Sequence, residues 1–133
     1  MVLVDASVWI DYFGGSESAE ALWLDRHLTS VRLAIADITL CEVLQGVRSD
    51  TQAKKVRQSL LDLAFCTTGG RDLALAAAAN YRNLRSRGIT VRKTVDCWIA
   101  TYCILKKLPL LHRDRDFEPF ALLGLEIIDP SRD

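Results

Sequence analysis

The sequence lacks any long apolar run, internal repeat or low-complexity tract. No apolar run approaches the ~20 residues that a membrane-spanning helix needs. The N-terminus has neither a basic flank nor a small-residue cleavage site, so we expect no signal peptide, no membrane contact and a cytoplasmic protein. Because no linker interrupts its 133 residues, the chain suits one compact domain over residues 1–133.

Cysteine and histidine patterns typical of metal sites are also missing. No pair of cysteines is spaced C-x-x-C, and His27 and His112 lie far apart in the chain. Three of the four cysteines fall in apolar helix or strand patterns. We therefore expect reduced core cysteines rather than a zinc site or a disulfide framework. The four are Cys41, Cys66, Cys97 and Cys103.

Net charge is zero, but its distribution along the chain is uneven. Residues 1–42 carry seven acids and two bases, a balance of −5, whereas residues 80–115 carry nine bases and two acids, a balance of +7. The basic segment could bind a phosphate backbone. Solvated helix faces explain the same charges, and from charge alone this second reading is favoured.

Hydrophobic patterns alternate between strand and helix along the whole chain. Strands are predicted at residues 2–4, 32–36, 64–67, 108–112 and 125–129. Helices are predicted at residues 7–13, 17–29, 39–47, 51–62, 72–87, 95–107 and 116–124, with Gly88 closing the Ala-rich fifth helix. This order predicts an α/β fold with a central, mostly parallel sheet and helices on both of its faces.

Acidic side chains recur where predicted strands end and helices begin. Asp5 follows the first strand, and Asp114 and Asp116 follow strand 108–112. Glu42 and Asp96 lie near the starts of two apolar helices. Because ligands of open α/β sheets bind outside the carboxyl ends of the strands, these acids are expected to share one rim.

Each acid also has a structural explanation. Asp5 could cap the helix that starts near Ser7, and Thr39-x-x-Glu42 fits a capping box. Asp96 in a first helical turn would favour the helix dipole, and Asp116 is well placed to cap helix 116–124. Taken together, however, the acids suggest a carboxylate cluster. Crowded carboxylates repel one another, and Mg²⁺ or Mn²⁺ relieves the repulsion and can activate water for phosphodiester cleavage.

Four segments resemble the motifs of PIN-domain ribonucleases, specifically VapC-type toxins of bacterial toxin–antitoxin pairs. They are VLVDASVWIDYF, TLCEVLQGVR, TVDCWIATYCI and LLHRDRDFEPF, in family order over nearly the whole chain. The resemblance implies a Mg²⁺- or Mn²⁺-dependent endoribonuclease. By position, it implies an acidic quartet of Asp5, Glu42, Asp96 and Asp114. It also implies that Asp116 is an accessory acid and that the Ser7 hydroxyl supports Asp5.

The resemblance also implies partners. Family members typically form homodimers and are inhibited by a cognate VapB-type antitoxin whose C-terminal segment wraps the toxin. Some apolar residues of the first two helices are candidates for an antitoxin groove or dimer face, although core packing is an equal alternative for Trp9 and Phe13. The candidates are Trp9, Tyr12, Phe13, Trp23 and Leu24. His112 departs from the family, which often has Thr or Ser there.

Roles are assigned on this basis. Asp5 and Asp96 are the expected direct metal ligands and Asp114 the next, while Glu42 binds water or a second ion, or acts as the general base. No histidine is well placed as a base, so water activated by the metal ion is the expected nucleophile. RNA contacts are expected from the basic segment, at Arg85, Arg87, Arg92 and Lys93.

Other classes of protein fit less well. A haloacid-dehalogenase-type phosphatase needs an aspartate two residues after the first, where this chain has Ser7. A response-regulator receiver needs an early acidic pair and an aspartate after its third strand, and neither is evident. A non-catalytic RNA-binding or scaffold protein remains the alternative, because the basic segment alone would serve it.

Overall fold

The computed structural model describes residues 1–132 and shows short strands alternating with helices. The strands are β1 (Val2–Val4), β2 (Leu33–Ala36), β3 (Ala64–Cys66) and β4 (Leu110–Leu111). The helices are α1 (Ala6–Phe13), α2 (Ala19–His27), α3 (Asp37–Gly46), α4 (Asp50–Leu61), α5 (Arg71–Ser86), α6 (Thr94–Lys106) and the 3₁₀ helix η1 (Arg115–Leu123). In the part of the chain that is described, no helix is both long and apolar enough to cross a bilayer.

The four strands form one parallel sheet in the order β3-β2-β1-β4. Consecutive strands β1, β2 and β3 step outward in one direction, and the chain then crosses back to place β4 on the other side of β1. The strand order therefore reverses between β1 and β4. A crevice at such a switch point, beyond the carboxyl ends of the strands, is where open α/β sheets bind ligands.

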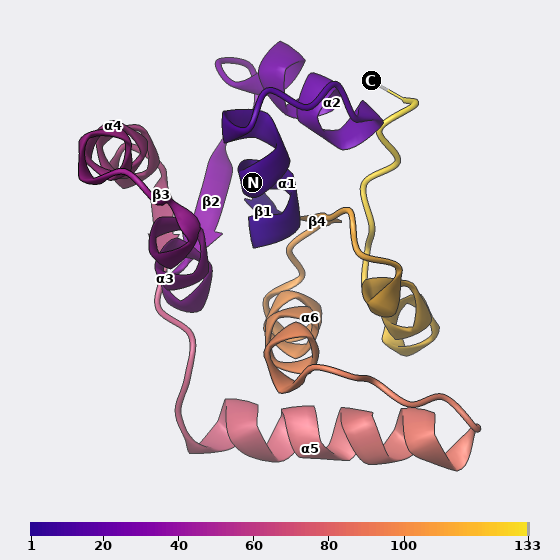
Figure 1. Cartoon of the computed structure of the whole chain (residues 1–133). Coiled ribbons are helices and arrows are strands. Elements are labelled where there is room, and N and C mark those ends of the chain that lie inside the picture. Colours follow the sequence, from indigo (N-terminus) through magenta and orange to yellow (C-terminus); the bar gives the residue numbers. More distant parts are fainter. Residues whose placement is uncertain (133) are drawn as a thin grey trace.

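Helices cover both faces of the sheet, as predicted (Figure 1). Alternate strand residues face opposite sides. Leu3 and Ala34 pack in one apolar cluster with residues of α5, α6 and η1. Val4 and Ile35 pack in a second cluster with residues of α1, α2, α3 and α4. Strands β1, β2 and β4 are thus buried on both sides, which explains their continuous apolar sequences.

Of the two elements predicted at the C-terminal end, the strand is wrong and the helix is confirmed. Residues 125–129 were predicted as a strand but form one isolated parallel bridge with β4, between Ile127 and Leu110. The two-residue β4 is too short a partner for a longer ladder. The short helix predicted at residues 116–124 is the 3₁₀ helix η1, which contains Pro119, and a proline supplies no amide hydrogen for a regular α-helix.

The expected capping box in α3 is not formed. This helix starts at Asp37, two residues earlier than predicted, and its N-cap Ala36 has no side chain to accept a hydrogen bond. Thr39 lies inside the helix and is buried. The structural explanation offered for Glu42 as part of a capping box is therefore wrong.

The apolar residues predicted for α1 and α2 divide into core and surface. Trp9, Trp23 and Leu24 are buried, so an interface role for these three is wrong. Tyr12 and Phe13 are half-buried. Cys66, Cys97 and Cys103 are buried, which confirms the predicted core position for three of the four cysteines, whereas Cys41 is exposed.

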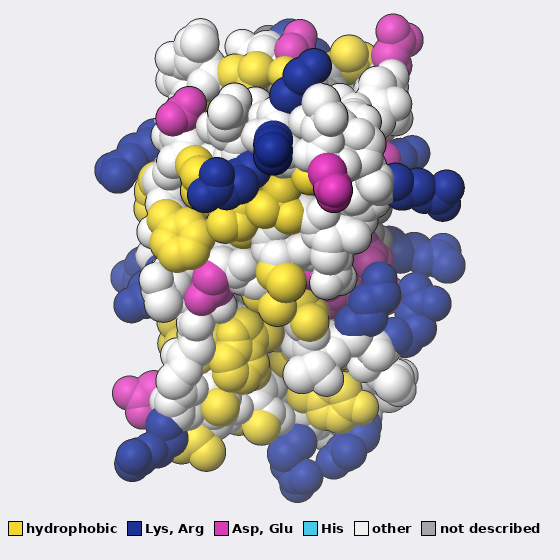
Figure 2. All heavy atoms as spheres, turned by 60° about the vertical axis from the view of Figure 1, so that its left-hand side comes forward, with side chains coloured by type: hydrophobic (Ala, Val, Ile, Leu, Met, Phe, Trp, Pro, Cys, Tyr) yellow, Lys and Arg dark blue, Asp and Glu magenta, His cyan; other side chains and the backbone are white. Residues whose placement is uncertain are grey.

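An exposed apolar area lies on the side of the molecule that carries α3, β3 and α5. Figure 2 brings this side forward and shows hydrophobic side chains gathered on it, with Lys and Arg at its margins. Phe65 in β3 and Leu75 in α5 are 55% and 64% exposed. Apolar side chains gathered on one side of a molecule are typical of an interaction surface.

Candidate active site

The acidic residues lie where the strand order reverses. Asp5 follows β1 directly, and Asp114 lies three residues after the end of β4. The first turn of α6 brings Asp96 to the same rim. Three segments far apart in the sequence therefore meet at one crevice, as the carboxyl ends of neighbouring parallel strands require.

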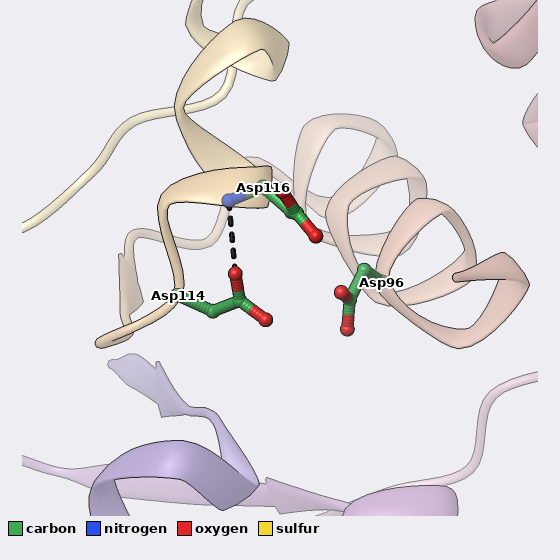
Figure 3. A group of neighbouring side chains, drawn as sticks. All are labelled: Asp96, Asp114 and Asp116. Atoms are coloured by element: carbon green, nitrogen blue, oxygen red, sulfur yellow. Dashed lines mark hydrogen bonds between the residues drawn. The ribbon is translucent and has the colours of Figure 1, made fainter. Parts of the chain in front are cut away.

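Three of the acids form a compact group. Carboxylate oxygens of Asp96, Asp114 and Asp116 lie within 4.8 Å of one another. Figure 3 shows the three side chains pointing into a common space, Asp96 from α6 and the other two from the start of η1. We refer to these three residues as the acidic triad. Its spacing suits one cation bound by several carboxylates.

Asp96 is the most deeply buried member of the acidic triad, with 7% of its surface exposed. Burial raises the pKa of its carboxyl to about 7, and the negative charges of Asp5 and Asp114 act in the same direction. Its Oδ2 atom is buried without a hydrogen-bond partner among the described residues. A buried, unsatisfied carboxylate oxygen is costly, and a bound cation would satisfy it.

Asp114 caps the helix η1 and also belongs to the acidic triad. Its Oδ1 accepts a 2.9 Å hydrogen bond from the Asp116 amide and so caps η1. Burial would raise the pKa of this carboxyl, but that amide and Lys93 outweigh it, and the pKa is lowered. Asp116 was the expected cap, and the structure corrects this: Asp116 donates to the cap, which leaves its own carboxylate for the triad.

Asp5 and Ser7 tie the end of β1 to the loop after β4. Asp5 Oδ2 accepts hydrogen bonds from the Ser7 amide at 3.1 Å and the Ser7 hydroxyl at 2.7 Å. The Ser7 hydroxyl in turn accepts a 3.0 Å hydrogen bond from the Arg113 amide. Asp5 is therefore the N-cap of α1, which confirms its structural explanation, and its charge also acts on Asp96.

Glu42 and Asp5 lie outside the acidic triad but within its electrostatic reach. Burial raises the pKa of Glu42 in α3, and the charge of Asp5 raises it further. Asp5 likewise acts on Asp96. The structure thus brings the five predicted acids to one rim, with Asp96, Asp114 and Asp116 closest together and Asp5 and Glu42 beside them.

Two of the four predicted RNA contacts are paired with the acidic triad. Arg92 donates two hydrogen bonds to Asp116, at 3.1 and 3.2 Å. The Lys93 ammonium lies 3.4 Å from Asp114 Oδ2. Arg85 and Arg87 are exposed at the end of α5. Sequence reasoning missed the pairing of Arg92 and Lys93, because neither residue is near its partner in the chain.

His112 contacts the backbone of the loop that follows β4. Its Nδ1 accepts a 3.1 Å hydrogen bond from the Asp114 amide. Burial lowers the pKa of the ring, against the opposing charge of Glu118. Its Nε2 lies 3.3 Å from Glu118 Oε1, but the approach lacks hydrogen-bond geometry. A neutral imidazole therefore orients the loop that carries Asp114.

Comparison with known proteins gives matches over nearly the whole chain. The PIN domain family model matches residues 2–122. A VapC ribonuclease of Mycobacterium bovis is 32% identical over 123 residues, which cover 91% of this chain and 92% of that protein.

Solved structures share the fold. A toxin–antitoxin complex from Klebsiella pneumoniae contains a chain that aligns with a TM-score of 0.74 at 24% identity, over 98% of both chains. VapBC-5 from Mycobacterium tuberculosis, a member of the VapBC family of toxin–antitoxin systems, contains a chain that aligns with a TM-score of 0.66 at 26% identity, over 96% of both chains.

Proposed function

This chain belongs to the PIN domain family, and from that premise we propose that it is a VapC-type endoribonuclease, the toxin of a type II toxin–antitoxin pair. It cleaves phosphodiester bonds of cellular RNA and so inhibits growth or translation unless its antitoxin is bound. The cleavage depends on a divalent cation, Mg²⁺ or Mn²⁺. The protein acts in the cytoplasm, where its RNA substrates are.

The observation that carries this proposal is the unsatisfied oxygen of Asp96 inside the acidic triad. Asp96, Asp114 and Asp116 together present a hard, all-oxygen donor set, which fits Mg²⁺ or Mn²⁺ and not a soft metal. Such an ion, when bound, offsets the negative charge that develops during phosphodiester cleavage and lowers the pKa of water. Asp5, held by Ser7, adds negative charge beside the triad and is a further candidate ligand.

Glu42 is proposed to act on a water molecule at the site, as its proton acceptor or as a hydrogen-bond partner that orders it. Its pKa is raised by burial and by Asp5, and a carboxylate with a raised pKa is a better proton acceptor near neutral pH. It either orders a water molecule at the site or takes its proton. His112 does not fit this role, because its Nδ1 is engaged with the Asp114 amide and its pKa is lowered.

RNA is held by the basic residues around the rim. Arg92 and Lys93 directly precede α6 and lie beside the acidic triad, where a scissile phosphate would approach. Arg85 and Arg87 extend the positive surface along the end of α5. Phosphate contacts of this kind bind RNA without reading its sequence.

Protein partners are proposed on two different surfaces. An antitoxin segment binds a groove of about 390 Å³ between α1, α3 and α4, whose lining includes Ile10, Phe13 and Val43. A second copy of the chain, giving a homodimer, packs on the apolar area on the side that carries α3, β3 and α5. The antitoxin proposal is supported by the structural relatives, which come from toxin–antitoxin complexes.

Cleavage of total cellular RNA tests the proposal against the alternative of a non-catalytic RNA-binding protein. Purified protein is incubated with the RNA in Mg²⁺, in Mn²⁺ or in EDTA, and new 5′ ends are sequenced. We expect discrete new ends with either metal ion and none with EDTA. RNA that is bound but left uncut under all three conditions would reject the nuclease and support the alternative.

A further inference from the structure

We propose that Lys93, assisted by Arg92, is a built-in competitor of the divalent cation that leaves the acidic triad when the ion binds and then becomes available to RNA phosphate. This inference rests on the proposed function, because it concerns the metal site of that function. It assigns to two residues a part in controlling metal occupancy, in addition to binding RNA.

The geometry places both cations on the triad. Lys93 is the N-cap residue of α6 and reaches Asp114 Oδ2 at 3.4 Å. The neighbouring Arg92 donates two hydrogen bonds to Asp116, and its Nη2 atom lies 3.0 Å from Asp116 Oδ2. Two adjacent residues thus occupy two of the three carboxylates that a metal ion would need.

Lys93 acts on more than its direct partner. Its hydrogen bond to Asp114 raises its pKa most, and the charges of Asp96 and then Asp114 raise it further. Its ammonium therefore lies in the field of the triad as a whole. A divalent ion at the same oxygens would place like charges side by side, so the ion and the ammonium compete for this site.

The side chains of Arg92 and Lys93 are held loosely, being 67% and 63% exposed. Among the described residues, the triad carboxylates are their only side-chain partners in hydrogen bonds and ion pairs. Exposed ion pairs of this kind are weak, so they can exchange. Long, flexible side chains at the rim can then turn from carboxylate to phosphate.

Competition has a consequence for RNA binding. A phosphate that engages Lys93 loosens its hold on Asp114 and thereby favours the metal ion. By linkage, a bound metal ion favours RNA to the same extent. The triad would then fill with metal most readily when RNA is present.

Titration of the metal-binding step alone tests this inference. Mn²⁺ binding is measured by calorimetry near pH 8 and low salt, without RNA, for the wild type, Lys93→Ala, Lys93→Met and Lys106→Ala. Lys106 is the matched control, because it removes one positive charge from the far end of the same helix. Lys93→Met keeps the alkyl chain, so it separates loss of charge from loss of packing.

We expect both Lys93 variants to bind Mn²⁺ about threefold more tightly or better, the scale of an exposed charge pair, and Lys106→Ala to match the wild type. In a second titration, a short RNA with cleavage-resistant linkages should tighten Mn²⁺ binding by the wild type more than by Lys93→Ala. Equal or weaker Mn²⁺ binding by the Lys93 variants would overturn the inference and leave the proposed function standing. Absence of Mn²⁺ binding by every protein would overturn both.

Discussion

The carboxyl of Asp96 is buried beside other acids, and its pKa is raised to about 7. A metal ion binds the ionised form, so below that pH binding has to displace a proton. We predict that Mn²⁺ affinity rises steeply from about pH 6 to about pH 8, with proton release at the lower end. Calorimetry in buffers of different ionisation enthalpy measures both quantities. A flat affinity profile would contradict the assignment of Asp96 as a ligand.

The raised pKa of Asp96 also makes the stability of the metal-free protein depend on pH. The folded state holds the Asp96 proton more tightly than the unfolded chain does. Its stabilising contribution is therefore full below the unfolded pKa of 3.8 and is lost as pH rises through about 7. Asp96→Asn should accordingly gain thermal stability over the wild type as pH increases, whereas Glu17→Gln, at an exposed site, should not.

Replacement of Asp5 by asparagine separates its two geometric roles. Asparagine caps a helix about as well as aspartate, so a pure cap would leave cleavage and stability nearly unchanged. If the charge serves the metal site, RNA cleavage should fall by orders of magnitude. Thermal stability without metal should rise, because one of several close carboxylates loses its charge, and Mg²⁺ should stabilise the variant less than the wild type. Thermal melts with EDTA and with Mg²⁺, beside one cleavage assay, measure these effects.

Single residues differ in how far the sequence could place them. The position of Asp5 and Asp96 at one rim was predictable, because the end of a parallel strand and the start of a following helix meet at the same edge of the sheet. The ion pairs of Lys93 and Arg92 were not, since their partners lie more than 20 residues away. Nor was the hydrogen bond from the Asp114 amide to His112, which depends on the conformation of the loop after β4.

At the scale of elements, helices were predicted well and the last strand was not. Ser18 and Ser49 cap α2 and α4, and Gly88 has the positive φ of a helix end, so local chemistry sets these boundaries. Residues 125–129 have a strand-like sequence, but pairing depends on β4, which is two residues long. A partner of that kind cannot be predicted from the segment itself.

The end of α5 and the start of α6 carry the basic surface that we propose binds RNA. Replacing Arg85, Arg87, Arg92 and Lys93 by alanine should reduce the slope of log affinity against log salt concentration by up to about 3, because each lost phosphate contact removes about 0.7 in a single strand. Fluorescence anisotropy with a short RNA, in EDTA to prevent cleavage, gives the slope. An unchanged slope would mean that these side chains are only solvated.

The groove between α1, α3 and α4 gives a prediction about the antitoxin. Ile10 lines the groove and is 52% exposed, so Ile10→Asp should leave the fold intact. A buried, unpaired carboxylate in the complex should weaken antitoxin binding by about tenfold or more, while RNA cleavage is retained. Leu22→Asp is the control, at an exposed apolar residue of α2 outside the groove. Equal affinities of wild type and Ile10→Asp for the antitoxin would place its binding elsewhere.

In the whole molecule, topology is what assembles the site. The sequence predicted a parallel α/β sheet, but not the order β3-β2-β1-β4 that puts the ends of β1 and β4 side by side. The fold also pairs some residues of the basic segment with acids elsewhere in the chain. Arg113, in the basic segment, contacts Asp11 at 2.6 Å and Glu20 at 3.7 Å, so part of that segment joins the loop after β4 to α1 and α2. The surface charge left for RNA is therefore smaller than the sequence balance suggests.

The central claim is that the acidic triad holds the cation on which RNA cleavage depends. The most direct measurement follows Mn²⁺ binding by electron paramagnetic resonance and cleavage of a defined RNA in the same samples, for the wild type and Asp96→Asn. The account predicts that wild-type cleavage rises with Mn²⁺ occupancy and stops in EDTA. Asp96→Asn should lose both bound Mn²⁺ and cleavage, the latter by about a hundredfold or more. Cleavage by the wild type in EDTA, or by Asp96→Asn at the wild-type rate, would contradict it.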